Sequence, residues 1–183
     1  MTAHATPEVT PVGADAPQAL WVVVMGVAGC GKSTIARCMA QALGITFIEG
    51  DAFHSPENVQ KMTQGIALDD ADRQGWLDRL GEELQQSSGG AVLSCSALKR
   101  AYRDRLRRAA PALRFVHLRI DQDLANARVA ARAPVHLFPT SLVASQFAAL
   151  EDPVAEPLAL QLDGALAPSV VCQLAVDWIR RTL

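Results

Sequence analysis

Residues 21–34 read WVVVMGVAGCGKST, an apolar, β-branched run followed directly by a glycine-rich loop. The loop matches the phosphate-binding pattern G-x-x-x-x-G-K-S/T in full, between an expected strand and an expected helix. Glycines let successive backbone N–H groups turn toward phosphate oxygens, and the helix N-terminus favours negative charge. A glycine-rich turn without a ligand is the alternative, but pattern and context together predict an ATP or GTP site. The predicted nucleotide-binding residues of this loop are Gly26, Gly29, Cys30, Gly31, Lys32, Ser33 and Thr34.

Two side chains of the loop have specific expected roles. Lys32 is predicted to reach the β and γ phosphates and to act in catalysis, and the Ser33 hydroxyl is predicted to ligate Mg²⁺. ATP and Mg²⁺ are therefore the expected cofactors.

Length and composition favour one globular domain. The chain has 183 residues, half of them apolar, and a formal net charge of −2, which gives no general attraction to nucleic acid. No apolar run reaches the roughly 20 residues of a membrane helix, so we expect neither nucleic acid nor membrane as a partner. Residues 1–19 are rich in Thr, Ala, Pro and Gly and lack a secretory pattern, which predicts a disordered tail before a single domain at 20–183.

The four cysteines, Cys30, Cys38, Cys95 and Cys172, lie far apart in the sequence. They form neither a Cys-x-x-Cys motif nor a compact disulfide framework. Free thiols and a cytoplasmic location are therefore expected.

Short apolar runs alternate with amphipathic stretches along the chain. The strand candidates are residues 21–26, 45–50, 91–96, 114–120 and 158–164. Strand and helix repeated in this way predict an α/β fold, with a parallel five-stranded sheet between two layers of helices. Gly44 is expected just beyond the first helix, and a small helical lid is expected at about residues 123–140.

The second expected strand ends in acidic and basic side chains. Ligands of open α/β sheets bind beyond the carboxyl ends of the strands, so Glu49, Asp51 and His54 should face the γ-phosphate. A carboxylate there can orient or deprotonate an acceptor hydroxyl. The alternative is an aspartate that only caps the helix beginning near Pro56.

Cations follow in three places. Lys99 and Arg103 share one helix face after the third strand, where they could bind an anionic substrate, and Arg73 is a further candidate. Arg128 and Arg132 share a face just before a proline-interrupted segment and could close over the phosphates. Solvated basic faces are the alternative, which we prefer for the three arginines Arg105, Arg107 and Arg108.

No aspartate ends the third strand, and no Asn-Lys-x-Asp guanine signature occurs, so a small-molecule kinase is favoured over a nucleotide-dependent switch or binding module. Four stretches, GVAGCGKST (26–34), EGDAFHSPENVQKMTQGIALDDADRQGWLDRL (49–80), SCSALKRAYRDRLR (94–107) and SQFAALEDP (145–153), resemble the bacterial gluconokinase family. The similarity covers about residues 20–180, in order and at near-family spacing.

This resemblance implies transfer of the ATP γ-phosphate to the 6-hydroxyl of D-gluconate, a fold like that of nucleoside monophosphate and shikimate kinases, and often a homodimer. It also implies that Asp51 is the catalytic carboxylate. The implied sugar-acid pocket comprises Asp51, His54, Arg73, Lys99 and Arg103; the implied lid contacts to ATP are Arg128 and Arg132, with Asp163 and Gly164 near the adenine.

The chain departs from the family pattern in three respects: at residue 75, in the spacing of the lid, and at Leu137, where the family has a phenylalanine. Gly75 stands where a proline is usual, which should loosen a turn, and RAPVHLF (132–138) lengthens the usual lid spacing between Arg132 and His136 by one residue. Charge alone leaves two alternatives open: a kinase of another small acid such as shikimate, or of a nucleoside monophosphate.

Overall fold

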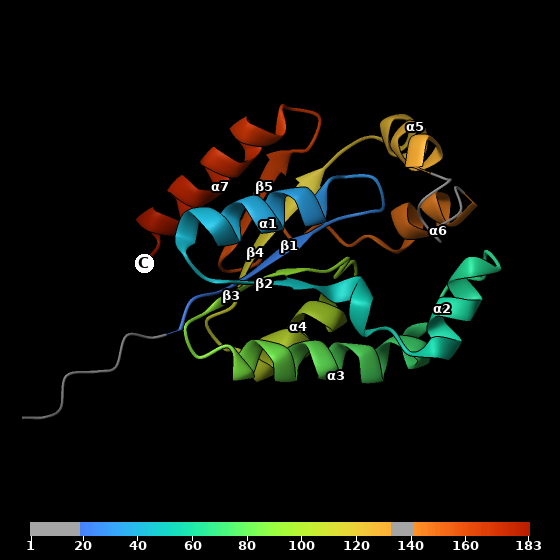
Figure 1. The fold of residues 1–183 in the computed structure, drawn as a ribbon. Coiled ribbons are helices and arrows are strands. Elements are labelled where there is room, and N and C mark those ends of the chain that lie inside the picture. The colour runs from blue at the N-terminus through green and yellow to red at the C-terminus, as the bar shows by residue number, and fades with distance from the viewer. Residues whose placement is uncertain (1–18, 133–140) are drawn as a thin grey trace, which may run out of the picture.

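The computed structural model describes residues 19–132 and 141–183, so the expected tail lies outside it except for residue 19. Five strands form one sheet in the order β2-β3-β1-β4-β5, and every pairing is parallel, which confirms the predicted fold class (Figure 1). The strands are β1 (Trp21–Met25), β2 (Thr46–Glu49), β3 (Ala91–Ser94), β4 (Arg114–Arg119) and β5 (Ala159–Asp163). The helices are α1 (Lys32–Leu43), the 3₁₀ helix η1 (Gly50–Phe53), α2 (Pro56–Thr63), α3 (Asp70–Gln86), α4 (Arg100–Ala109), α5 (Gln122–Arg132), α6 (Ser141–Ala149) and α7 (Pro168–Arg181).

The sheet separates two apolar cores. Successive side chains of a strand point to opposite faces, and β1 shows this directly: Val22 and Val24 pack in one core, Val23 and Met25 in the other. Helices α1 and α7 cover the first face, α5 adds side chains to the same core from beyond the carboxyl ends of the strands, and α3 and α4 cover the second face (Figure 1). Burial on both faces explains why the strand runs are almost continuously apolar.

Helix ends follow local capping chemistry. Gly44 adopts a left-handed φ of 68° and its N–H bonds the carbonyls of Ala40 and Gln41, as predicted for a residue just beyond a helix. Helix α2 is capped by the Ser55 hydroxyl, which accepts from the Asn58 N–H at 3.2 Å. The alternative that Asp51 serves only as the cap of α2 is therefore wrong.

Two local expectations need correction. Gly75 lies inside α3 and not in a turn, and a methyl group there would meet no atom within 4 Å. Cys38 and Cys172 form a disulfide that joins α1 to α7, whereas all four thiols were expected to be free. The two cysteines are 134 residues apart, so only the packing of α1 beside α7 brings them together (Figure 1). Cys30 and Cys95 are free and buried.

Within the described residues, no helix combines the length and the apolar character that a membrane crossing requires.

Candidate active site

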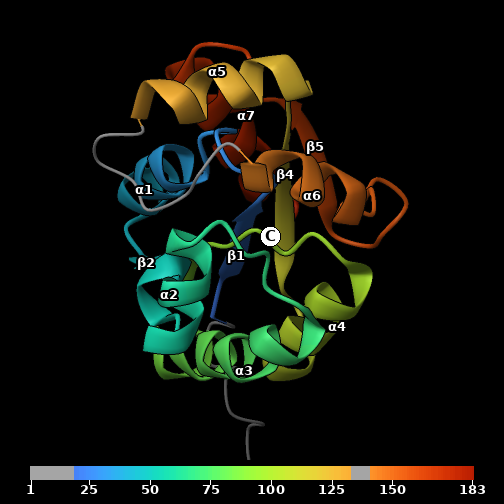
Figure 2. The same cartoon turned by 90° about the vertical axis from the view of Figure 1, so that its right-hand side faces the viewer.

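A cavity of about 340 Å³ lies at the carboxyl ends of β1, β2 and β3. Its walls come from the phosphate-binding loop, from η1 and α2, from the start of α3, and from α5 and α6. Figure 2 views the molecule from this end, where α2, α5 and α6 surround the ends of the strands. The lining residues are Ala28, Gly29, Gly31, Lys32, Ser33, Thr34, Asp51, His54, Val59, Met62, Ala67, Leu68, Arg73, Ser96, Val129, Leu142, Ser145 and Gln146.

The phosphate-binding loop is held closely against α5. Gly29 has a φ of 79°, and a Cβ there would lie 2.8 Å from the Ala125 carbonyl oxygen, so glycine is required on both counts. Lys32 Nζ donates to the Val27 carbonyl at 3.0 Å. This contact keeps the ammonium group at the loop, in the wall of the cavity.

The Ser33 hydroxyl lies 3.3 Å from the Ser94 hydroxyl at the end of β3. The described residues contain no cluster of three or more His, Cys, Asp or Glu side chains that could cage a metal ion. One serine hydroxyl beside the phosphate-binding loop, with Asp51 on the same cavity, suits Mg²⁺, which binds few protein ligands and shares the substrate phosphates.

Asp51 and His54 lie where the sequence predicted, beyond the end of β2. The chain can turn sharply there because Gly50 has no side chain: a Cβ would lie 2.2 Å from the Ser94 carbonyl oxygen. Asp51 is exposed on the cavity wall, in η1.

The His54 ring stacks on Trp76, with ring centroids 4.2 Å apart, and Trp76 Nε1 donates to the Gly50 carbonyl at 2.8 Å. Burial lowers the pKa of His54 to about 4, against the opposing effect of Asp51 and with the help of Arg73. Its Nδ1 is buried without a hydrogen-bond partner among the described residues. His54 is therefore a neutral group at pH 7, able to accept or donate one hydrogen bond.

Arg73 lines both the main cavity and a neighbouring cavity of about 220 Å³, and its guanidinium lies 5.7 Å from the Tyr102 ring centroid. Lys99 lines only the neighbouring cavity, where Nζ contacts Asp70 Oδ1 at 2.6 Å. The Tyr102 hydroxyl donates to the same carboxylate. Hydrogen bonds from Lys99 and Tyr102 lower the pKa of Asp70. The structure thus places Arg73 at the main site and Lys99 beside it.

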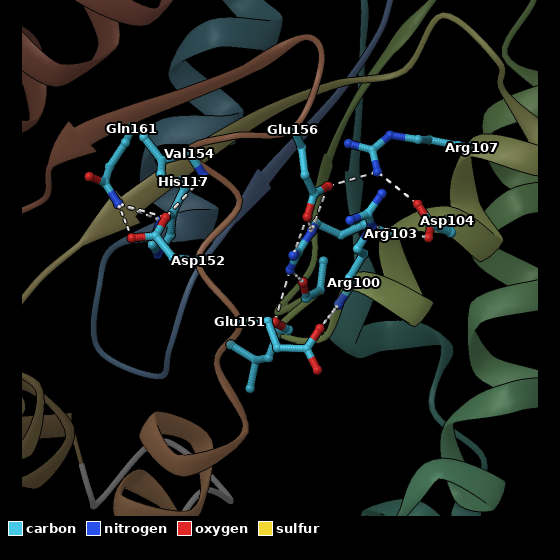
Figure 3. Close-up of polar contacts among 12 residues, drawn as sticks. Arg100, Arg103, Asp104, Arg107, His117, Glu151, Asp152, Val154, Glu156 and Gln161 are labelled. Atoms are coloured by element: carbon cyan, nitrogen blue, oxygen red, sulfur yellow. Dashed lines mark hydrogen bonds and ion pairs between the residues drawn. The ribbon is translucent and has the colours of Figure 1, made fainter.

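Arg103 is not where the sequence predicted. Its side chain is fully buried and lines neither cavity. Its guanidinium donates to the Ala97 and Leu98 carbonyls at 2.8 Å each and pairs with Glu156, which sequence reasoning missed (Figure 3). Arg103 therefore holds together two segments of the fold and has no free donor directed at a substrate.

Arg107 also departs from expectation, because it is not on a solvated face. It contacts Glu156 Oε2 at 2.7 Å, with 17% of its side chain exposed, and its guanidinium lies 4.6 Å from the Phe115 ring centroid. Burial alone would raise the pKa of Glu156, but the hydrogen bonds and charges of Arg103 and Arg107 lower it overall. Glu156 is therefore a carboxylate held between two guanidinium groups.

Arg128 joins the phosphate-binding loop to the loop that follows β5. Its Nη1 donates to the Gly164 carbonyl at 2.9 Å and lies 3.4 Å from the Gly29 carbonyl oxygen. Arg132 is the last residue of α5, and its side chain lies outside what the structure describes, as do residues 133–140 of the expected lid and His136.

Sequence reasoning missed Ser94, Ser96 and Gln146. Ser94 and Ser96 stand where other phosphate-binding-loop proteins carry an acidic residue, so the search for a carboxylate passed over them. Gln146 lies in SQFAALEDP, which carries part of the family resemblance, but nothing in that stretch alone indicates a role for this residue.

Comparisons with known proteins identify the family of the chain. A family model described as an AAA domain matches residues 21–157. The chain is 43% identical over 160 residues to the gluconokinase of Gluconobacter oxydans, covering 84% of this chain and 87% of that one. The crystal structure of a gluconokinase from Sinorhizobium meliloti superposes with a TM-score of 0.82 at 43% identity, covering 90% of this chain and 94% of the other.

A second crystal structure, of a sugar kinase from a Janibacter species, gives a TM-score of 0.83 at 40% identity and covers 88% of this chain and 95% of that one. With relatives of this similarity over most of its length, the chain belongs to the gluconokinase family.

Proposed function

We propose that this protein transfers the γ-phosphate of ATP to the 6-hydroxyl of D-gluconate, giving 6-phospho-D-gluconate and ADP. The observation that carries the proposal is a single cavity with two chemically different walls. One wall is the phosphate-binding loop with Lys32 and Ser33; the other presents Asp51, His54 and Arg73. A triphosphate bound on the first wall would point its terminal phosphate at an acceptor on the second.

In the proposed reaction, the acceptor hydroxyl oxygen attacks the γ-phosphorus as the bond to the leaving ADP oxygen breaks. Asp51 orients the hydroxyl and accepts its proton. Lys32 and the loop N–H groups stabilise the charge that builds on the phosphoryl oxygens. Mg²⁺, held by Ser33 and by the phosphates themselves, would neutralise part of that charge.

The acceptor wall suits a polyhydroxy acid. Arg73 supplies a permanent positive charge for a carboxylate, and neutral His54 can hydrogen-bond a hydroxyl without adding charge. Lys99 lies one cavity away, on Asp70, and would contribute only to a substrate that extends into the neighbouring cavity.

The proposal also covers the ATP contacts, the cellular location and the oligomeric state. Arg128, Arg132 and the loop at Asp163 and Gly164 are proposed to surround the base and phosphates of ATP, with residues 123–140 as a lid. We also propose a cytoplasmic protein that acts as a homodimer.

The test is ADP release with ATP and Mg²⁺ over a panel of acceptors containing gluconate, other sugar acids, shikimate and nucleoside monophosphates. Saturable turnover with gluconate is expected. Turnover with shikimate or a mononucleotide but not with gluconate would overturn the proposal. Nucleotide binding without acceptor-stimulated ADP release would indicate a binding module.

Asp51→Asn tests the assigned base. Turnover should fall by about 10² or more while ATP affinity stays nearly unchanged, because the amide cannot accept the proton. Asp177→Asn, on α7 and away from the cavity, is the matched control and should retain wild-type turnover. Near-normal turnover of Asp51→Asn would remove Asp51 from the catalytic role.

A further inference from the structure

Gln146 is a polar side chain from α6 that lines both the main cavity and the neighbouring one. Only 9% of it is exposed, which is unusual for a glutamine unless its amide has partners. Buried polar groups are normally hydrogen-bonded, so both the oxygen and the nitrogen of this amide are expected to have a hydrogen-bond partner.

The amide oxygen has a partner within the protein. Gln146 Oε1 accepts a hydrogen bond from the Ala28 N–H of the phosphate-binding loop at 2.6 Å. A backbone N–H can only donate, so this contact fixes which end of the amide faces the loop. The Nε2 group must therefore face away from Ala28, and among the described residues it donates to no protein acceptor.

The helix that carries Gln146 is fastened to the rest of the fold just after its end. The Glu151 carboxylate accepts from the Arg100 N–H at 2.6 Å, and the Glu151 N–H donates to the Leu98 carbonyl at 2.9 Å (Figure 3). Five residues further on, Glu156 pairs with Arg103 and Arg107. These contacts tie the chain after α6 to α4, while the hydrogen bond from the Ala28 N–H orients the Gln146 amide itself.

We propose that Gln146 binds the phosphoryl acceptor: Nε2 donates a hydrogen bond to an oxygen of the sugar acid while Oε1 stays on Ala28. One amide would then touch both the loop that holds the triphosphate and the molecule that receives the phosphate. This fixes the acceptor relative to the loop, and proximity of this kind is a large part of what a phosphoryl-transfer site supplies. The assignment rests on the proposed function and adds a donor to the acceptor wall.

Gln146→Glu separates the two ends of the amide. Glutamate keeps an oxygen that can accept from Ala28 but replaces the donor with a second, negatively charged acceptor. It would face an acceptor rich in oxygen and carrying its own negative charge. The gluconate KM should rise by about 10- to 100-fold, as expected for the loss of one hydrogen bond in a charged site. ATP affinity, measured by calorimetry with a non-hydrolysable analogue, should fall by a smaller factor than the gluconate KM rises, because the Ala28 N–H keeps its acceptor although the new charge lies beside the loop.

Gln146→Met is a second test variant, which adds no charge and preserves the length of the side chain. It lacks the donor as well, so the gluconate KM should again rise by more than the dissociation constant of the ATP analogue. Because burying a charge can destabilise the fold, this variant decides the matter if Gln146→Glu does not fold. Gln86→Glu, at the opposite end of α3 from the cavity, makes the same chemical change on an exposed residue and should leave both constants unchanged.

A wild-type gluconate KM in Gln146→Glu would overturn the inference, and so would a change confined to ATP affinity in Gln146→Met. Either result would make Gln146 a support for the phosphate-binding loop only. Failure of the proposed function looks different, because the unsubstituted enzyme would then not phosphorylate gluconate at all.

Discussion

Replacing Arg103 by alanine tests directly whether this arginine serves the substrate or the fold. Its guanidinium is fully buried and donates to Glu156 and to the carbonyls of Ala97 and Leu98. Alanine would leave Glu156, whose side chain is only 7% exposed, with Arg107 as its one remaining cationic partner among the described residues. The Ala97 carbonyl would also lose its donor, and the Leu98 carbonyl would keep only the Glu151 N–H.

Removing one member of a buried ion pair usually costs about 3–5 kcal/mol, because the other charge stays buried. Arg107 still neutralises part of the Glu156 charge, so the lower end of this range, about 3 kcal/mol, is expected for Arg103→Ala. For a domain of this size that corresponds to a fall in Tm of about 6–12 °C.

The assay is urea unfolding followed by circular dichroism, for Arg103→Ala, Glu156→Ala and the double variant, with the gluconate KM measured for each. If the two residues act as a pair, the double variant should be less destabilised than the sum of the single ones, by about 1–3 kcal/mol. Any rise in gluconate KM should then appear equally in Glu156→Ala, because both changes loosen the segment that follows α6.

Additive and small stability losses would refute this reasoning, above all if Arg103→Ala alone raised the gluconate KM. Such a result would return Arg103 to the sugar-acid pocket, where the family resemblance placed it. Arg105→Ala is the matched control: this neighbouring arginine pairs with Asp78 at the surface, and its loss should cost no more than about 1 kcal/mol.

Three further outcomes are expected. Gly75→Ala should stabilise the protein by about 0.5–1 kcal/mol in urea unfolding, since alanine is the better helix former and meets no neighbour; destabilisation would mean that α3 is irregular there. Reducing the Cys38–Cys172 disulfide, or replacing Cys38 by serine, should lower the free energy of unfolding by up to about 5 kcal/mol, because the disulfide restricts a loop of 134 residues in the unfolded chain. The urea midpoint of Cys38→Ser should not change when reductant is added. An unchanged wild-type midpoint on reduction would show that no disulfide forms. Burial lowers the pKa of His54 to about 4, so the unfolded chain binds a proton at a higher pH than the folded protein, and the free energy of unfolding falls as the pH drops from 6.5 toward 4. In His54→Asn the free energy of unfolding should therefore fall less steeply over that pH range. An unchanged slope would contradict the pKa shift.

The sheet was predictable from the sequence because the information is local. Each strand is four to six residues long and contains a short group of apolar side chains, and Gly44 and the phosphate-binding loop mark helix boundaries within a few residues. The phosphate-binding loop was predictable for the same reason: its function depends on backbone geometry that consecutive residues dictate. Helix α6 was missed because its mean apolar character is spread around the helix, so no stripe stands out in SLVASQFAA.

The predictions that were wrong concern residues whose partners lie far away in the sequence. Lys99 stands at the N-cap of α4 and Arg103 lies inside the helix, and nothing in their spacing of four distinguishes a substrate contact from a structural one. They differ because Arg103 points into the fold, where Glu156 arrives from a segment more than fifty residues later, whereas Lys99 lies at the edge of a cavity and meets Asp70. The disulfide between Cys38 and Cys172 likewise depends on a partner distant in sequence, 134 residues away.

The same dependence on distant partners gives Gln146 its place in the site. The amide matters only because Ala28, 118 residues earlier, offers an N–H at 2.6 Å, and because Glu151 and Glu156 hold the chain behind it. If Gln146 binds the acceptor, Arg103 should act on the pocket indirectly, through the segment that it anchors ten residues after Gln146. On this reasoning Arg103→Ala and Glu156→Ala should share not only a stability loss but also a modest rise in gluconate KM, and that rise should disappear in a background where Gln146 has already been replaced by methionine. A full effect of Arg103→Ala on KM in the Gln146→Met background would break the connection and leave the two residues independent.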